Sequence, residues 1–393
     1  MTTKLHRIYI LSFLFSLHLA ISAYVNSTFL SQVVGEHYVG LLYTASAFIT
    51  LLLLSNTRVI LKQLGNKKLT IITLLINMLG LLGLIISKDA IVISLSFILF
   101  IATNYVVLYC LDIFIEHFGD PKSVGKTHGI YLTFINIGWV ISPTITAYLI
   151  ANKGGYIAVY VLAFLTVCLI VIGMLLGVGK FEDKTYKKKP FLEMYRFIKT
   201  NRHIRAITII NFLLQFFFSW MVVYTPIYLY EYIGLGWDKL GTIFTIMLLP
   251  FVLFGIPIGK LIDNYHVHKR KLLIFGTFII SVATMSISFI SNNNIALWAF
   301  VLFMTRFGAA IIETVSEVYF FTHVKEEDAS ILSVFRDMPP LSFIIAPLLG
   351  TLFLSFFPFK YLFLTLGILM LTSLYYIKLL KHTSEFYENN GTN

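Results

Sequence analysis

The chain has 393 residues, of which 58% are hydrophobic and only 12% are charged, and it carries a formal net charge of +11. Soluble domains carry about 25% charged residues, so this composition excludes an ordinary soluble protein. The basic residues lie between long apolar runs rather than in one continuous patch, and this placement argues against a nucleic-acid partner.

Apolar runs long enough to cross a bilayer, about 17–25 residues, recur along the whole chain. We predict twelve spanning helices, at residues 8–25, 38–57, 69–87, 91–115, 129–151, 156–178, 205–230, 239–262, 272–290, 295–320, 331–356 and 361–379. The prediction is an all-α membrane protein with two six-helix bundles, residues 1–178 and 205–380. A basic cytoplasmic linker, 179–204, joins the bundles, and a short cytoplasmic tail, 381–393, follows them. The linker is either a helix lying on the membrane surface or a solvated connection.

Lysine and arginine residues distinguish the two sides of the membrane. With both termini on one side, only Lys88, Lys153 and Lys360 fall in connections on the other side. The positive-inside rule then places both termini in the cytoplasm. We predict an integral protein of the plasma membrane, a monomer whose partners are the lipid bilayer and a small-molecule substrate.

The second half of the chain repeats the first at a distance of about 200 residues. The segment FLSQVVG at 29–35 returns as YLYEYIG at 228–234, and KKL at 67–69 returns as RKL at 270–272. Two such pseudo-symmetric bundles of membrane helices, with a cavity between them, are the architecture of a carrier.

In the first half, polar side chains gather in the first and fourth predicted spans. His18 lies near the middle of the first span, and Tyr105, Tyr109, Asp112 and Glu116 share one face of the fourth. Ionisable groups are costly inside a bilayer, and they usually face water, substrate or each other. We predict that His18, Tyr105, Tyr109 and Asp112 line a substrate or proton cavity. For His18 the alternative is a role in helix packing.

The second half repeats this pattern in the seventh and tenth spans. Asn211 and Gln215 are one turn apart on the seventh, and Arg306, Glu313 and Glu317 share one face of the tenth. We predict that Asn211, Gln215, Arg306 and Glu313 line the same cavity. The alternative for the two amides is a hydrogen bond to a neighbouring helix.

Short motifs at the ends of the spans resemble those of the major facilitator superfamily. GKLID at 259–263 and KRK at 269–271 are similar to its motif between helices two and three, and Pro143 and Pro347 to its helix-five signature. In the first half, Arg58 and Lys62 replace the glycine and aspartate of that motif. The resemblance implies twelve helices in two halves, the first, fourth, seventh and tenth lining the cavity. It also implies that the two prolines are helix-packing residues.

A cytoplasmic gate is predicted from the same motif and from charged residues near it. Asp263 is suited to a helix N-terminus, where the helix dipole favours an anion. The predicted gate residues are Glu116, Gly259, Asp263, Lys269, Arg270, Glu317, Arg336 and Asp337. Plain anchoring of the topology by basic loops is the alternative.

We predict a secondary active transporter that moves a small molecule by alternating access. We predict no cofactor and no metal site, and proton coupling is a further hypothesis. An aromatic content of 16% favours export of drugs or other amphiphiles. The alternatives are import of a sugar or of an organic anion, the second favoured by Arg306.

We predict no enzymatic activity and no catalytic residues, because phosphate-loop, GxSxG and HExxH motifs are all missing. A lipid-modifying membrane enzyme and a sensor that does not transport are the alternatives from other functional classes. Neither the residue spacing of such an enzyme nor an added signalling domain is found in the sequence.

Overall fold

The computed structural model describes residues 3–119, 124–152, 154–178, 199–263, 268–323 and 338–380. These ranges are helical apart from short connections and contain no strand. Eleven of the described helices are long and apolar enough to cross a membrane, and a shorter apolar helix spans Met338–Leu354. A backbone in hydrocarbon must satisfy its hydrogen bonds internally, and helices do so. The predicted all-α membrane fold is confirmed.

The helices follow the predicted spans closely. Those of the first half are α1 (Thr3–Ala23), α2 (Asn26–Val34), α3 (Glu36–Leu64), α4 (Asn66–Ile86), α5 (Ala90–Phe118), α6 (Val124–Asn152) and α7 (Gly155–Gly177). Those of the second half are α9 (Arg202–Ile227), η2 (Tyr228–Tyr232), α10 (Trp237–Asp263), α11 (Lys269–Ile287), α12 (Ile295–His323), α14 (Met338–Leu354), α15 (Lys360–Leu371) and α16 (Ser373–Lys378). The seventh predicted span is α9 continued by the π-helix η2, and the twelfth is α15 followed by α16.

The sequence repeat is visible in the backbone at two glycines. Gly35 separates α2 from α3 with a φ of 85°, and Gly234 follows η2 with a φ of 74°. Glycine adopts positive φ without the steric penalty that a β-carbon brings. The repeated segments 29–35 and 228–234 therefore both end in a left-handed residue.

Packing divides the chain into two compact units. Unit 1 comprises Met1–Tyr186, Val222–Thr245 and Pro347–Thr351, and unit 2 comprises Lys187–Met221, Ile246–Ala346 and Leu352–Asn393. Unit 1 thus adds the end of α9, η2, the start of α10 and part of α14 to the helices of the first half. The predicted boundary at the linker stays a prediction, because residues 179–198 and the tail 381–393 lie outside the described ranges.

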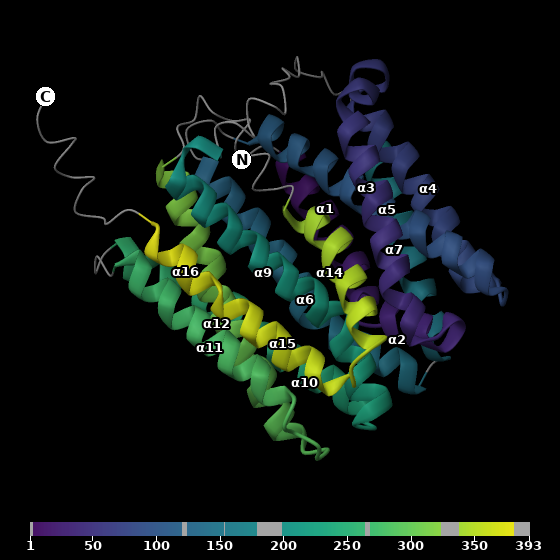
Figure 1. Ribbon diagram of the computed structural model, residues 1–393. Helices are drawn as coiled ribbons and strands as arrows, with labels where there is room; N and C mark the ends of the chain where they lie inside the picture. Colours follow the sequence, from purple (N-terminus) through teal and green to yellow (C-terminus); the bar gives the residue numbers. More distant parts are fainter. Residues whose placement is uncertain are drawn as a thin grey trace, which may run out of the picture. The chain divides into compact units, whose positions relative to one another are not determined.

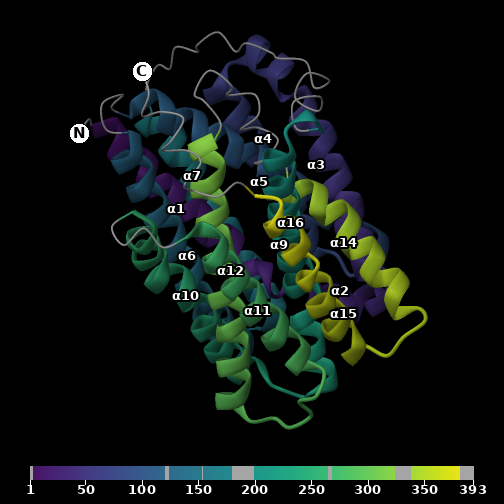
Figure 2. The same ribbon diagram turned by 60° about the vertical axis from the view of Figure 1, so that its left-hand side comes forward.

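Corresponding helices pack in the same way in each unit. In unit 1, α4 packs against α5 and α7, and in unit 2, α11 packs against α12, α15 and α16 (Figures 1 and 2). The α11–α12 contact is close, because a β-carbon on Gly308 would come within 2.7 Å of the Gly276 carbonyl oxygen. Small residues at such contacts let helix backbones approach in the membrane.

Candidate functional site

A buried cation lies inside unit 2. The Arg306 side chain on α12 is 1% exposed. Its guanidinium carbon lies 5.2 Å from the ring centre of Phe217 and 5.5 Å from that of Phe218, both on α9. A guanidinium within about 6 Å of an aromatic face is attracted to it, and the attraction grows when water is excluded. The predicted cavity residue Arg306 is therefore held between α12 and two rings of α9.

Two carboxylates follow Arg306 along α12 towards its C-terminal end. Glu313 is half-buried and Glu317 is exposed. Glu313 interacts electrostatically with both Glu317 and Arg306. The structure therefore brings three predicted residues into one row, with the cation at its most buried end and exposure increasing from there.

The two predicted amides lie on α9, the helix that also carries the rings under Arg306. Asn211 is buried and Gln215 is half-buried. The Gln215 Nε2 atom is 3.5 Å from the Asn211 Oδ1 atom. The two side chains thus interact along their own helix and add neutral hydrogen-bonding groups to unit 2.

Further phenylalanines surround this part of unit 2, and the sequence did not single them out. Phe218 lies 5.9 Å from Phe251, and Phe254 lies 4.6 Å from Phe307 and 6.3 Å from Phe303, measured between ring centres. All five rings are half-buried. The chain has 36 phenylalanines spread over its spans, so no pattern marks these five.

The predicted stripe on α5 belongs to unit 1. The Tyr131 hydroxyl of α6 donates a hydrogen bond to the Asp112 Oδ1 atom at 3.0 Å. Tyr109 packs against an apolar cluster between α3, α4 and α5. Tyr105 is half-buried and Glu116 is exposed near the end of α5. Their cavity and gate roles stay predictions.

His18 lies in a packed interior of unit 1. Its side chain is fully buried. Its Nδ1 atom is 3.2 Å from the Ala163 carbonyl oxygen of α7. The imidazole lies 5.5 Å from the rings of both Phe15 and Phe100. These contacts describe a helix-packing environment, and its cavity role stays a prediction.

Two predicted gate residues bind neighbouring helices of unit 2. The Lys269 ammonium donates to the Thr322 hydroxyl of α12 at 3.2 Å. The Arg270 guanidinium donates to the Lys378 carbonyl at the end of α16 at 3.1 Å. The start of α11 is therefore bonded to the C-terminal ends of two other helices. Basic side chains are stabilising there, because the helix dipole places partial negative charge at a C-terminus.

The remaining gate residues are described only in part. Gly259 lies near the end of α10, with no atom within 4 Å of the place a β-carbon would take. Asp263 is the last residue of α10, and its side chain is not among those described. Arg336 and Asp337 lie outside the described residues. The gate therefore stays a prediction.

Sequence reasoning missed a set of contacts in unit 1 that joins the two halves of the chain. The Ser31 hydroxyl of α2 donates to the Glu231 Oε1 atom of η2 at 2.5 Å. The Tyr232 hydroxyl of η2 lies 2.8 Å from both carboxylate oxygens of Glu36 on α3. Such short O–H···O⁻ distances are typical of charge-assisted hydrogen bonds. Topology prediction assigns this end of the helices to the outer side.

Two close helix crossings lie in the same unit. The Tyr224 hydroxyl donates to the Pro347 carbonyl at 2.7 Å, and a β-carbon on Gly40 would lie 2.5 Å from that carbonyl oxygen. A β-carbon on Gly241 would lie 2.9 Å from the Pro143 carbonyl oxygen. Both prolines predicted as helix-packing residues lie at these crossings.

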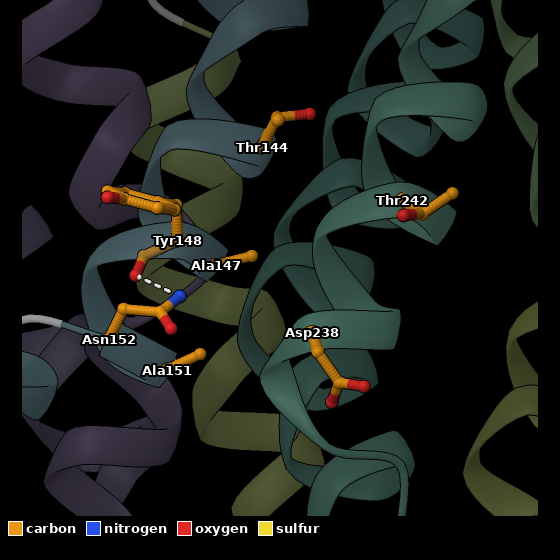
Figure 3. A pocket seen from close by; sticks show the side chains of 7 residues that line it. All are labelled: Thr144, Ala147, Tyr148, Ala151, Asn152, Asp238 and Thr242. Atoms are coloured by element: carbon orange, nitrogen blue, oxygen red, sulfur yellow. Dashed lines mark hydrogen bonds between the residues drawn. The ribbon is translucent and has the colours of Figure 1, made fainter.

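A small cleft lies between α6 and α10 beside the second crossing. Its lining residues include Thr144, Tyr148 and Asn152 on α6 and Asp238 and Thr242 on α10, the helix beside it (Figure 3). The cleft has a volume of about 170 Å³. Asp238 is the one charged side chain among its lining residues. This cleft was not predicted, because its residues form no stripe within a single span.

Within the described ranges, no group of three or more His, Cys, Asp or Glu side chains could hold a metal ion.

The comparisons with known proteins agree with this architecture. A family model described as Major Facilitator Superfamily matches residues 8–338 and again residues 226–391. The chain belongs to the Major Facilitator Superfamily. This superfamily member is therefore an integral membrane protein and a secondary transporter rather than a member of an enzyme family. No curated protein matches its sequence.

Solved structures resemble this superfamily member along nearly its whole length. The POT family transporter PepTSo is 11% identical, covers 99% of each chain and gives a TM-score of 0.79. A mutant form of the nucleoside transporter NupG is 13% identical, covers 97% of this chain and 100% of its own, and gives 0.76. The human organic anion transporter MFSD10 (TETRAN) is 12% identical, covers 95% of this chain and 99% of its own, and gives 0.69. At such identities the likeness shows the fold alone.

Proposed function

We propose that this protein is a proton-coupled secondary transporter of small amphiphilic molecules, working by alternating access. It lies in the plasma membrane as a monomer with both termini in the cytoplasm, and the proton is its coupling species. The row of charges on α12 is the observation that carries this proposal.

Glu313 is the coupling carboxylate in this proposal. It is half-buried. Arg306 attracts its carboxylate and Glu317 repels it. Adding or removing its proton changes the net charge beside a buried cation. Interactions of that kind are strong where the effective dielectric constant is low.

The contacts in unit 1 support alternating access. They tie helices of the first half to η2, α10 and α14 of the second half, at the end assigned to the outer side. Alternating access requires the two halves to separate there. Hydroxyl–carboxylate bonds suit this, because Glu36 is 24% exposed and water can replace the tyrosine as its donor.

Flux measurements in liposomes test the proposal. The purified protein is reconstituted, a pH gradient of either sign is imposed, and the movement of fluorescent amphiphiles of both charges is followed. We expect flux to follow the gradient in the wild type and to ignore it in Glu313→Gln. Asp89→Asn, which also replaces a carboxylate by an amide but at an exposed position just before α5, should behave as the wild type. Wild-type flux that is independent of the gradient would contradict proton coupling.

A further inference from the structure

The charge of unit 2 is graded along α12. The positive group, Arg306, is the deepest and is almost wholly buried, whereas Glu313 is half-buried and Glu317 is exposed. Among the described residues, Arg306 and Glu317 are the charged groups that act on Glu313. A substrate that reaches the depth of Arg306 therefore meets a cation, and an anionic group is the one it attracts.

The surroundings of Arg306 suit an apolar body attached to that anionic group. Phe217 and Phe218 lie against the guanidinium. The half-buried ring of Phe218 in turn lies 5.9 Å from the ring of Phe251, measured between ring centres. An aromatic ligand gains both from burial and from edge or stacked contacts with such rings. A small hydrophilic anion would gain nothing from them.

We infer, resting on the proposed function, that the substrate is an amphipathic organic anion and that it binds together with the coupling proton. The acid group of the substrate pairs with Arg306, and its apolar body lies against the phenylalanines of α9 and α10. Glu313 is the group whose protonation is linked to binding of the substrate.

The linkage follows from the charges. An anion beside Arg306 is repelled by ionised Glu313, about 10 Å along the helix for seven residues. At that separation and an effective dielectric constant of about 20, the repulsion weakens binding about tenfold. Protonated Glu313 exerts no such repulsion. Binding the anion therefore takes up a proton, and protonation tightens anion binding by the same factor.

This linkage also bears on the direction of transport. A proton and an anion that bind together cross together, so an inward proton gradient drives uptake. Export of amphiphiles, which the aromatic content favours, requires proton and substrate to exchange. The charges of unit 2 favour uptake of the anion.

Three naphthalene compounds with fixed charge test the inference on the purified full-length protein. They are 1-naphthalenesulfonate, the neutral 1-naphthalenemethanol and the quaternary ammonium (1-naphthylmethyl)trimethylammonium. Their affinities are measured by calorimetry from about pH 5 to about pH 10. We expect the sulfonate to bind most tightly, and its affinity to fall about tenfold as pH rises. Because the sulfonate does not titrate there, this slope reports on the protein.

Variants assign the effect to the two residues. Glu313→Gln should bind the sulfonate with no dependence on pH, and Arg306→Gln should lose its preference for the sulfonate over the alcohol. Arg202→Gln, an exposed arginine at the start of α9, is the matched control and should behave as the wild type. If Arg306→Gln does not fold, the pH slopes of the wild type and Glu313→Gln decide.

The outcomes separate this inference from the proposed function. Tighter binding of the ammonium compound, or a sulfonate slope that persists in Glu313→Gln, overturns the inference while proton-coupled flux in liposomes still stands. Conversely, proton-linked sulfonate binding without gradient-dependent flux keeps the inferred site and overturns the proposed function.

Discussion

At the scale of single residues, the Tyr131–Asp112 bond offers a test of how unit 1 holds a carboxylate inside the membrane. Tyr131 is 5% exposed and donates to Asp112 at 3.0 Å. Tyr131→Phe removes this donor and leaves the ring. Hydrogen bonds to charged groups contribute about 1.5–3 kcal/mol, so we expect a lower melting temperature in detergent. Tyr148→Phe, an exposed tyrosine on the same helix, is the control, and equal melting of both variants would contradict the prediction.

Single residues also show which parts of the candidate site could be predicted from sequence patterns. A stripe such as Arg306, Glu313 and Glu317 follows from helical periodicity, and the structure places the three in one electrostatic row. The partners of Arg306 did not follow, because Phe217 and Phe218 are on another helix and look like any other apolar residue. Glu231 and Tyr232 were missed because they lie at a span end, where polar residues are ordinary.

At the scale of helices, the α6–α10 crossing depends on the absence of one side chain. A side chain at Gly241 would meet the Pro143 carbonyl and the Ala147 side chain. We expect Gly241→Leu to force the two helices apart and to destabilise the protein by about 1–3 kcal/mol, the usual range for overpacking. The measurement is the thermal melt together with transport activity.

A second glycine on the same helix is the control for that experiment. Gly255 has no atom within 4 Å of the place its β-carbon would take. Gly255→Leu should therefore melt close to the wild type. Similar losses in both variants would show that the effect belongs to glycine in a helix rather than to the crossing.

Whole helices were easier to predict than their ends. Length and hydropathy give the spans, because a bilayer demands about 20 apolar residues in helical form. They do not give the π-helix η2 that follows α9. Its Glu231 contacts Ser31 of another helix, and no local pattern contains that contact.

At the scale of the whole molecule, unit 1 includes two segments of the second half, Val222–Thr245 and Pro347–Thr351, which the repeat alone did not predict. A repeat gives two equivalent bundles, but it does not say at which end their helices meet. The contacts of Glu36 and Glu231 with hydroxyl groups identify that end in this structure. In the alternating-access cycle that we propose, these contacts break once in every cycle.

Crosslinking these contacts should therefore stop transport. Cys110 and Cys168, both within spans, are first replaced by alanine. Ser31→Cys and Glu231→Cys are then combined and joined by a short thiol-specific crosslinker. The control pair, Gln32→Cys with Tyr156→Cys, is also in contact but lies wholly within the first half. We expect the crosslinker to abolish flux only in the first pair, because only that pair joins the two halves.

If the single variant Glu231→Cys is already inactive, the pair Glu36→Cys with Tyr232→Cys replaces the first pair. Full flux through a protein whose halves are crosslinked at this end would mean that these contacts never open during transport.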